Sequence, residues 1–333
     1  MNNKESERKY YLDIMRGIAT VFVVLFHVTS NKFVSSWLGT FQLYIFFFVS
    51  GCLFRNQSAD RYIRSKIHHI IIPYFVWGMI TLAYYWLIER SFRSLGLTIK
   101  DCLEGLLLGI QSKLDFNTPL WLVGCFILTS VIYYCLYHLL ARYLRESIVY
   151  TVMFGLFVVF YIVFDICGIT WGVYSAFRVP GFLLVYLFGN VFIRYCSNRV
   201  NCSRTALSVL IGVCLLVLSG LIHFYYHVII VTVITGVIGT LILAMGIRRL
   251  VILEYVGRAS FLIMCIHGPI YRVLVFVLGK IIYKSTETIR GNIIISVMVS
   301  ILSILTCLVI DKVIDICMTK MHKKLNANRP ILR

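Results

Sequence analysis

Ten runs of apolar residues divide this 333-residue chain, and each is close to the length that an α-helix needs to cross a membrane. About 20 helical residues span a hydrocarbon core of ~30 Å. Hydrophobic residues make up 60% of the chain and charged residues only 14%, whereas a soluble domain has about 25% charged residues. We therefore predict an all-α, polytopic transmembrane helical bundle that forms a single integral membrane domain over residues 1–333.

The longest apolar stretch, 206–247, would be ~63 Å long as one helix, about twice the hydrocarbon thickness. We place a hairpin within it, near His223–His227. In the segment 90–118, the stretch Leu103–Ile110 is predicted to be either a short interfacial helix or a packed loop. The ten predicted spans are 11–29, 39–54, 69–89, 119–140, 148–167, 179–195, 206–225, 227–247, 259–279 and 291–312.

The distribution of positive charge predicts the orientation. With the N-terminus inside, the cytoplasmic segments carry 21 Lys and Arg residues and the outer segments carry 9. Because cytoplasmic loops are enriched in Lys and Arg, this bias predicts that both termini are cytoplasmic. It also supports the hairpin, since one span in place of two would move one terminus to the other side.

Charge and cysteine content exclude several classes of protein. The net charge of +18 would suggest nucleic-acid binding in a soluble protein, but here most basic residues lie in short loops between apolar runs, as the sorting rule requires. The eleven cysteines form no CxxC pair or regular framework. We predict no nucleic-acid partner, no metal and no permanently bound cofactor, and the oligomeric state is left open.

The first span contains three ionisable residues, Asp13, Arg16 and His27, and such residues within a span are functional candidates. Arg16 and His27 share one helical face but are about 16.5 Å apart along the axis, too far to form a catalytic pair. This separation suits either two ends of one long ligand or two ligands that meet along a tunnel, with Arg16 binding a phosphate and His27 acting as general base on a hydroxyl. In the alternative, Arg16 snorkels or pairs with Asp13, and His27 is an interfacial histidine.

Two further groups of polar residues each share one helix face and are also functional candidates. Arg61 and Arg64 are three residues apart after span two and predict one cationic helix face, which either anchors the chain at the inner surface or binds a phosphorylated donor. Ser260, His267 and Tyr271 share one face of span nine. His267 could face the same cavity as His27, or its hydrogen bonds could be satisfied within the bundle.

Together these features resemble the acyltransferase-3 family of integral membrane acyltransferases, in particular the branch related to fucose 4-O-acetylases. In this family the opening span carries a basic residue, then ten further residues, then a histidine, and Arg16 and His27 fit that spacing. The other elements follow in the same order along the chain. The elements that carry the resemblance are Leu12–Ala19 with Val23–His27, Phe46–Gly51, Arg61-Tyr62-Ile63-Arg64, Leu120-Trp121-Leu122 and Gly257–His267.

The resemblance implies transfer of an acetyl group from acetyl-CoA, as co-substrate, to a hydroxyl of an extracytoplasmic polysaccharide or lipid-linked sugar. It implies a multi-pass protein of the bacterial inner membrane, in contact with membrane lipid. His27 and Arg16 become the catalytic candidates, and Arg16, Arg61 and Arg64 the candidate contacts of the CoA phosphates. The candidate acceptor or cavity residues are Asp13, Trp121, Ser260, His267 and Tyr271.

One departure concerns span nine. Family members often carry a tyrosine shortly before the late histidine, and Met264 and Cys265 occupy that stretch here. A second hypothesis, a transporter or flippase of a phosphorylated or sugar-linked substrate, would use the arginines as anion sites without bond chemistry. The lack of detectable inverted repeats weighs against it.

Overall fold

The structure is a computed structural model that describes residues 10–169, 172–197, 205–283 and 285–327. Within these ranges the chain is helical and contains no β-strand. The α-helices, in chain order, are α1 (Tyr10–Val28), α2 (Lys32–Cys52), α3 (Ala59–Lys66), α4 (Ile72–Leu87), α5 (Ile99–Leu108), α6 (Trp121–Leu140), α7 (Glu146–Ile166), α8 (Val179–Val191), α9 (Thr205–Tyr226), α10 (Ile229–Ile247), α11 (Val251–Arg258), α12 (Ser260–Leu278), α13 (Thr286–Gly291) and α14 (Ile293–Ala327).

Ten helical segments in the described chain are long and apolar enough to cross a membrane, which confirms the predicted number of spans. α2 begins seven residues earlier than predicted, because Asn31 caps it by accepting a hydrogen bond from the backbone N–H of Val34. The third segment is also longer than predicted, since α3 continues through a π-helical turn, Ile67–Ile71, into α4.

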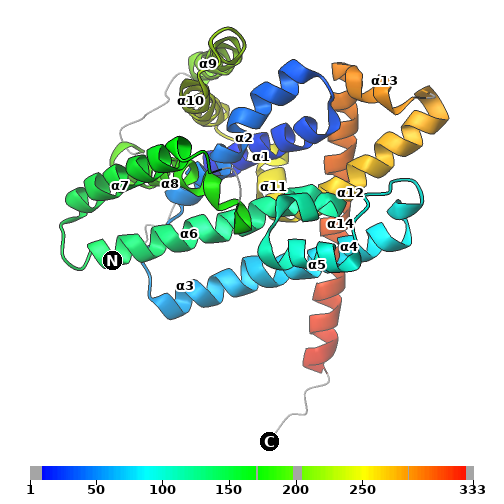
Figure 1. The fold of residues 1–333 in the computed structure, drawn as a ribbon, viewed down its shortest axis with the longest axis horizontal. Helices are drawn as coiled ribbons and strands as arrows, with labels where there is room; N and C mark the ends of the chain where they lie inside the picture. Colours follow the sequence, from blue (N-terminus) through cyan, green and yellow to red (C-terminus); the bar gives the residue numbers. More distant parts are fainter. Residues whose placement is uncertain (1–9, 170–171, 198–204, 284, 328–333) are drawn as a thin grey trace, which may run out of the picture.

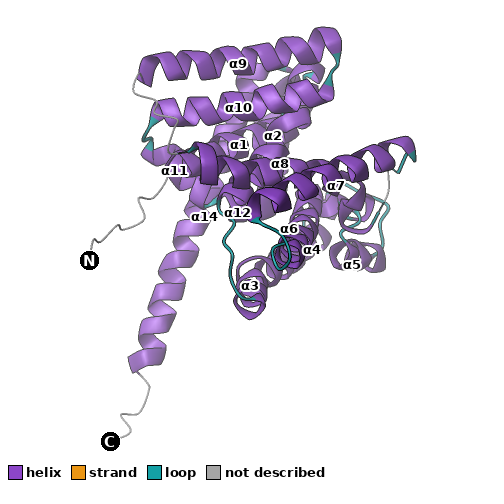
Figure 2. Ribbon diagram, turned by 90° about the vertical axis from the view of Figure 1, so that its left-hand side faces the viewer, coloured by secondary structure: helices purple, strands orange, loops and turns teal. Residues whose placement is uncertain are grey.

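The predicted hairpin is confirmed. α9 ends at Tyr226 and α10 begins at Ile229, and His227 between them has φ +53°, a left-handed conformation that turns the chain. Figure 2 shows the two helices side by side. The stretch Leu103–Ile110 falls mostly within α5, so it is a helix rather than an irregular loop.

The helices cross at steep angles. Figure 1 shows α6 running across the page, α14 running down it, and α9 and α10 almost end-on. α1 lies in the interior, where it contacts α2, α10, α11, α12 and α14. Two glycines allow its closest contact, since Gly17 lies against the backbone of Leu253 and Gly257 of α11 lies against the backbone of Asp13. α1 is therefore surrounded by protein.

Apolar side chains cover the outside of the bundle as well as its interior. Val159 on α7, Leu210 on α9 and Val309 on α14 are each more than half exposed. An outer surface of this kind is unfavourable in water and favourable against lipid tails. It supports membrane insertion independently of helix length.

Four connections lie at one end of the bundle, which we call the His27 end; their described residues there are 29–31, 88–120, 172–178 and 285–292. The backbone N–H of Ser30 donates to the carbonyl of Arg290 over 2.8 Å, which joins the first and last of them. The Tyr174 hydroxyl donates to the carbonyl of Leu107 over 2.6 Å, which joins the other two. The charge distribution predicts that this end is extracytoplasmic.

Candidate active site

Three of the predicted site residues come together at the His27 end. His27 lies in the last turn of α1, and His267 and Tyr271 lie one turn apart on α12. The His27 and His267 ring centroids are 5.3 Å apart, and the Tyr271 ring stacks on His27 at 6.1 Å. The structure therefore places His27 and His267 side by side, although 240 positions separate them in sequence.

The hydrogen bond of His267 defines its tautomer. Its side chain is fully buried, and Nδ1 lies 2.7 Å from the carbonyl oxygen of Ile263, one turn earlier. A carbonyl can only accept, so Nδ1 carries the proton and Nε2 is left with a lone pair. Nε2 has no hydrogen-bond partner among the described residues. His267 is thus a buried acceptor beside His27.

A cavity of about 310 Å³ opens next to His27. His27 lines it and His267 does not, although Met264, one turn earlier on α12, does. His27 is therefore the histidine that a bound molecule would meet, and His267 lies behind it. The cavity is lined by Val23, Phe26, His27, Gly39, Gln42, Leu43, Gln111, Thr118, Pro119, Trp121, Leu122, Arg178 and Met264.

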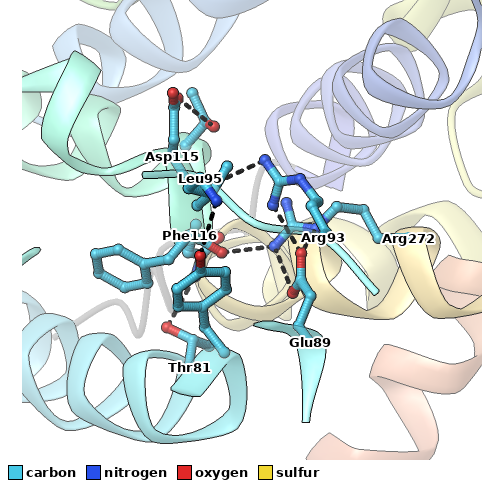
Figure 3. A network of polar contacts seen from close by, with 10 residues as sticks. Thr81, Glu89, Arg93, Leu95, Asp115, Phe116 and Arg272 are labelled. Carbon is cyan, nitrogen blue, oxygen red and sulfur yellow. Dashed lines mark hydrogen bonds and ion pairs between the residues drawn. The ribbon is translucent and has the colours of Figure 1, made fainter. Parts of the chain in front are cut away.

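A buried ionic network holds α12 against the chain that precedes α6 (Figure 3). Glu89, which is fully buried, forms ion pairs of 2.7 Å with both Arg93 and Arg272. Arg272 also donates to the carbonyl of Phe116 over 2.5 Å, and Arg93 to the carbonyl of Asp115 over 3.1 Å. Because Arg272 follows Tyr271 directly, the network fixes the segment of α12 that carries the site.

Asn117 also holds α12, at a position closer to His267 than the ionic network at Arg272 is. Its side-chain amide donates to the carbonyl of Cys265 over 2.7 Å and to the hydroxyl of Thr81 over 3.2 Å. Gly268 makes room for this contact, since a Cβ at that position would lie 2.7 Å from the Asn117 side-chain oxygen. Gly268 therefore permits α12 to approach the turn before α6.

The sequence patterns missed this network. Arg272 lies within span nine, so the rule that marks a charge inside a span, which selected Arg16, would also have selected Arg272. Glu89 carries a weaker signal because it lies at the end of its span, where a carboxylate is ordinarily solvated. Asn117 and Gly268 give no signal that distinguishes them from turn and packing residues.

The remaining predicted residues lie outside the cavity, except Trp121, which lines it. Arg16 is half-buried on α1, and no carboxylate within the described ranges forms an ion pair with it. Asp13 packs its backbone against α11, and Ser260 is buried at the start of α12. The described residues contain no cluster of His, Cys, Asp and Glu able to hold a metal ion.

Arg61 and Arg64 are exposed on α3. Arg64 lies 3.9 Å from Asp60, but both side chains are more than 70% exposed, so the pair contributes little to stability. Figure 1 places α3 at the opposite end of the continuous α3–α4 segment from α5 and its neighbours. The structure therefore separates these arginines from His27.

A family model described as an acyltransferase domain matches residues 9–312 of the chain. The chain belongs to the acyltransferase-3 family. Searches of curated proteins and of solved structures gave no match. Family membership favours the acyltransferase over the transporter that the sequence left open.

Two residues just before His267 have structural roles in this acyltransferase. Met264 lines the cavity, and the carbonyl of Cys265 accepts the hydrogen bond from Asn117. Tyr271, one turn after His267, supplies an aromatic ring beside both histidines.

Proposed function

We propose that this acyltransferase moves an acetyl group from cytoplasmic acetyl-CoA to a hydroxyl of an extracytoplasmic polysaccharide or lipid-linked sugar, in the inner membrane of a bacterium. The observation that carries the proposal is the position of His27, which lines a cavity at the end of the bundle predicted to be extracytoplasmic and has a second histidine behind it. The resemblance to fucose 4-O-acetylases agrees with a sugar acceptor.

The donor enters from the opposite end in this proposal. Arg16 lies on the same face of α1 as His27, about 16.5 Å away along the helix axis. A long, flexible arm of the CoA type can cover that distance, with its phosphates near Arg16 and its thioester near His27. Arg61 and Arg64, exposed on α3, would meet the nucleotide at the inner surface.

The chemical step requires one base. His27 accepts the proton of the acceptor hydroxyl as its oxygen attacks the thioester carbonyl carbon. The new carbon–oxygen bond forms, the carbon–sulfur bond breaks, and the leaving thiolate takes the proton from the His27 imidazolium. The products are the acetyl ester and free CoA thiol, so no oxidant or further reactant is needed.

His267 has a supporting role in this mechanism. Its Nε2 can only accept a hydrogen bond, because Nδ1–H is held by the Ile263 carbonyl. It can therefore receive an N–H from His27 and fix the ring orientation in which the other nitrogen faces the cavity. Tyr271, stacked on His27, limits rotation of the ring further.

The test is replacement of His27. We expect His27→Ala to lower acetyl transfer by at least about 100-fold, the usual contribution of a general base, measured as release of CoA thiol and as acetyl content of surface glycans. The matched control is His138→Ala on α6, since His138 bonds a carbonyl of its own helix but does not line the cavity. Full activity in a correctly inserted His27→Ala protein would remove His27 from the mechanism.

A further inference from the structure

Arg178 is the one basic residue, apart from His27, among those that line the cavity. It directly precedes α8, and its guanidinium carbon lies 4.3 Å from the centroid of the Trp121 ring. The ring holds the guanidinium plane in place by cation–π attraction. Arg178 therefore presents a fixed positive charge in the cavity that holds His27.

No counter-ion for Arg178 is present in the described part of the chain. None of the residues that line the cavity is acidic, and none of the ion pairs formed by described residues involves Arg178. The contrast with Arg272 is informative, because that arginine is neutralised by Glu89. A half-buried arginine without a counter-ion lowers its free energy by binding an anion.

Gln42 is a second unsatisfied group in the same cavity. Its side chain is 2% exposed, and its amide oxygen has no hydrogen-bond partner among the described residues. An amide oxygen at a cavity wall can accept a hydrogen bond from a sugar hydroxyl. Gln111 and Thr118 add further polar groups, and the volume of about 310 Å³ is at the small end of ligand pockets, which suits one sugar ring.

We propose that Arg178 binds an anionic group, a carboxylate or a phosphate, carried by the sugar that receives the acyl group, while Gln42 accepts a hydrogen bond from one of its hydroxyls. The inference rests on the proposed function in one respect, namely that the acceptor occupies this cavity. It extends that function by giving the acceptor a charge. Arg178 lies at the His27 end, so it is separate from the arginines assigned to the donor phosphates.

The experiment measures binding of three probe sugars to the purified full-length protein in detergent, by ligand-observed NMR titration. The probes are methyl glucuronide, which carries a carboxylate, glucose 6-phosphate, and neutral methyl glucoside. We expect at least one anionic sugar to bind about tenfold more tightly than the neutral one, a difference of about 1.4 kcal/mol. The preferred anion distinguishes an acidic sugar residue from a phosphorylated one.

Three variants assign the preference to a residue. Arg178→Gln should remove it, and Arg178→Lys, which keeps the charge, should retain part of it and serves if the glutamine variant does not fold. Arg90→Gln is the matched control, because Arg90 also stacks on a tryptophan, Trp86, at 4.2 Å but outside this cavity. It should keep the full preference.

An equal response to the three sugars, including no response to any, would overturn the inference, and so would an undiminished preference in folded Arg178→Gln. His27→Ala separates this outcome from the proposed chemistry. A charge preference that persists in His27→Ala, together with loss of acetyl transfer, supports both. A preference that persists while transfer is unchanged supports the anion site and refutes His27 as the base.

Discussion

Removal of the charge of Glu89 should destabilise the protein strongly. Glu89→Gln leaves Arg272, whose side chain is 11% exposed, without its carboxylate. Breaking a buried ion pair by removing one partner costs about 3–5 kcal/mol. Because Arg272 keeps its hydrogen bond to the Phe116 carbonyl, we expect the lower end of this range, about 3 kcal/mol. Arg93 is 32% exposed and is solvated more easily, so it adds less.

The free energy of unfolding can be measured by titrating the purified protein with denaturing detergent and following helix content by circular dichroism. Glu146→Gln is the matched control, since Glu146 pairs with Arg194 where the two side chains are 42% and 29% exposed, and such a pair is worth about 0–1 kcal/mol. The double variant Glu89→Gln/Arg272→Gln should regain part of the loss. Equal destabilisation by Glu89→Gln and Glu146→Gln would refute this account of the network.

Two other perturbations follow from local geometry. Gly268→Ala should destabilise the protein by about 1–3 kcal/mol, because the added methyl group overpacks against Asn117. The control is Gly155→Ala, which has open space around its Cβ and should be neutral or stabilise the protein by up to about 1 kcal/mol. Thermal unfolding of the two variants tests this, and equal effects would contradict the packing argument. Hydrogen bonds from the Thr98 side chain and backbone lower the pKa of Asp101 to about 2. A carboxylate of this kind stabilises the fold above its unfolded pKa near 4 and loses that contribution as pH falls through 2. The stability difference between wild type and Asp101→Asn should therefore be constant from pH 7 to about 4 and vanish towards pH 2, and a difference independent of pH would exclude this role of the capping carboxylate.

The spans were predictable because insertion into lipid depends mainly on length and composition, both of which are local properties of the sequence. The hairpin between α9 and α10 followed from length alone, since the apolar stretch was too long for one crossing. The start of α2 was missed because it depends on the Asn31 cap rather than on hydropathy. The resemblance to the acyltransferase-3 family as a whole was confirmed by the match over residues 9–312.

The walls of the cavity could not be predicted in the same way. Helical periodicity places His27 and His267 on faces of their own helices, but it does not say which helices are neighbours. Gln42, within α2, and Arg178, just before α8, both line the cavity because α2 and α8 pack against each other. Arg178 looked like an ordinary loop arginine, and its stacking on Trp121 is visible only in three dimensions.

The helix that carries His27 is immobilised at both ends. Near its start, Gly17 and Gly257 allow the backbones of α1 and α11 to pack in direct contact. At its finish, Arg290 donates through Nε to the carbonyl of Val28 over 3.1 Å, and its own carbonyl receives the N–H of Ser30. α1 is therefore held in place within the bundle, and both substrates must reach His27 where it lies. We expect any conformational change that admits a sugar to occur in the connections around the cavity.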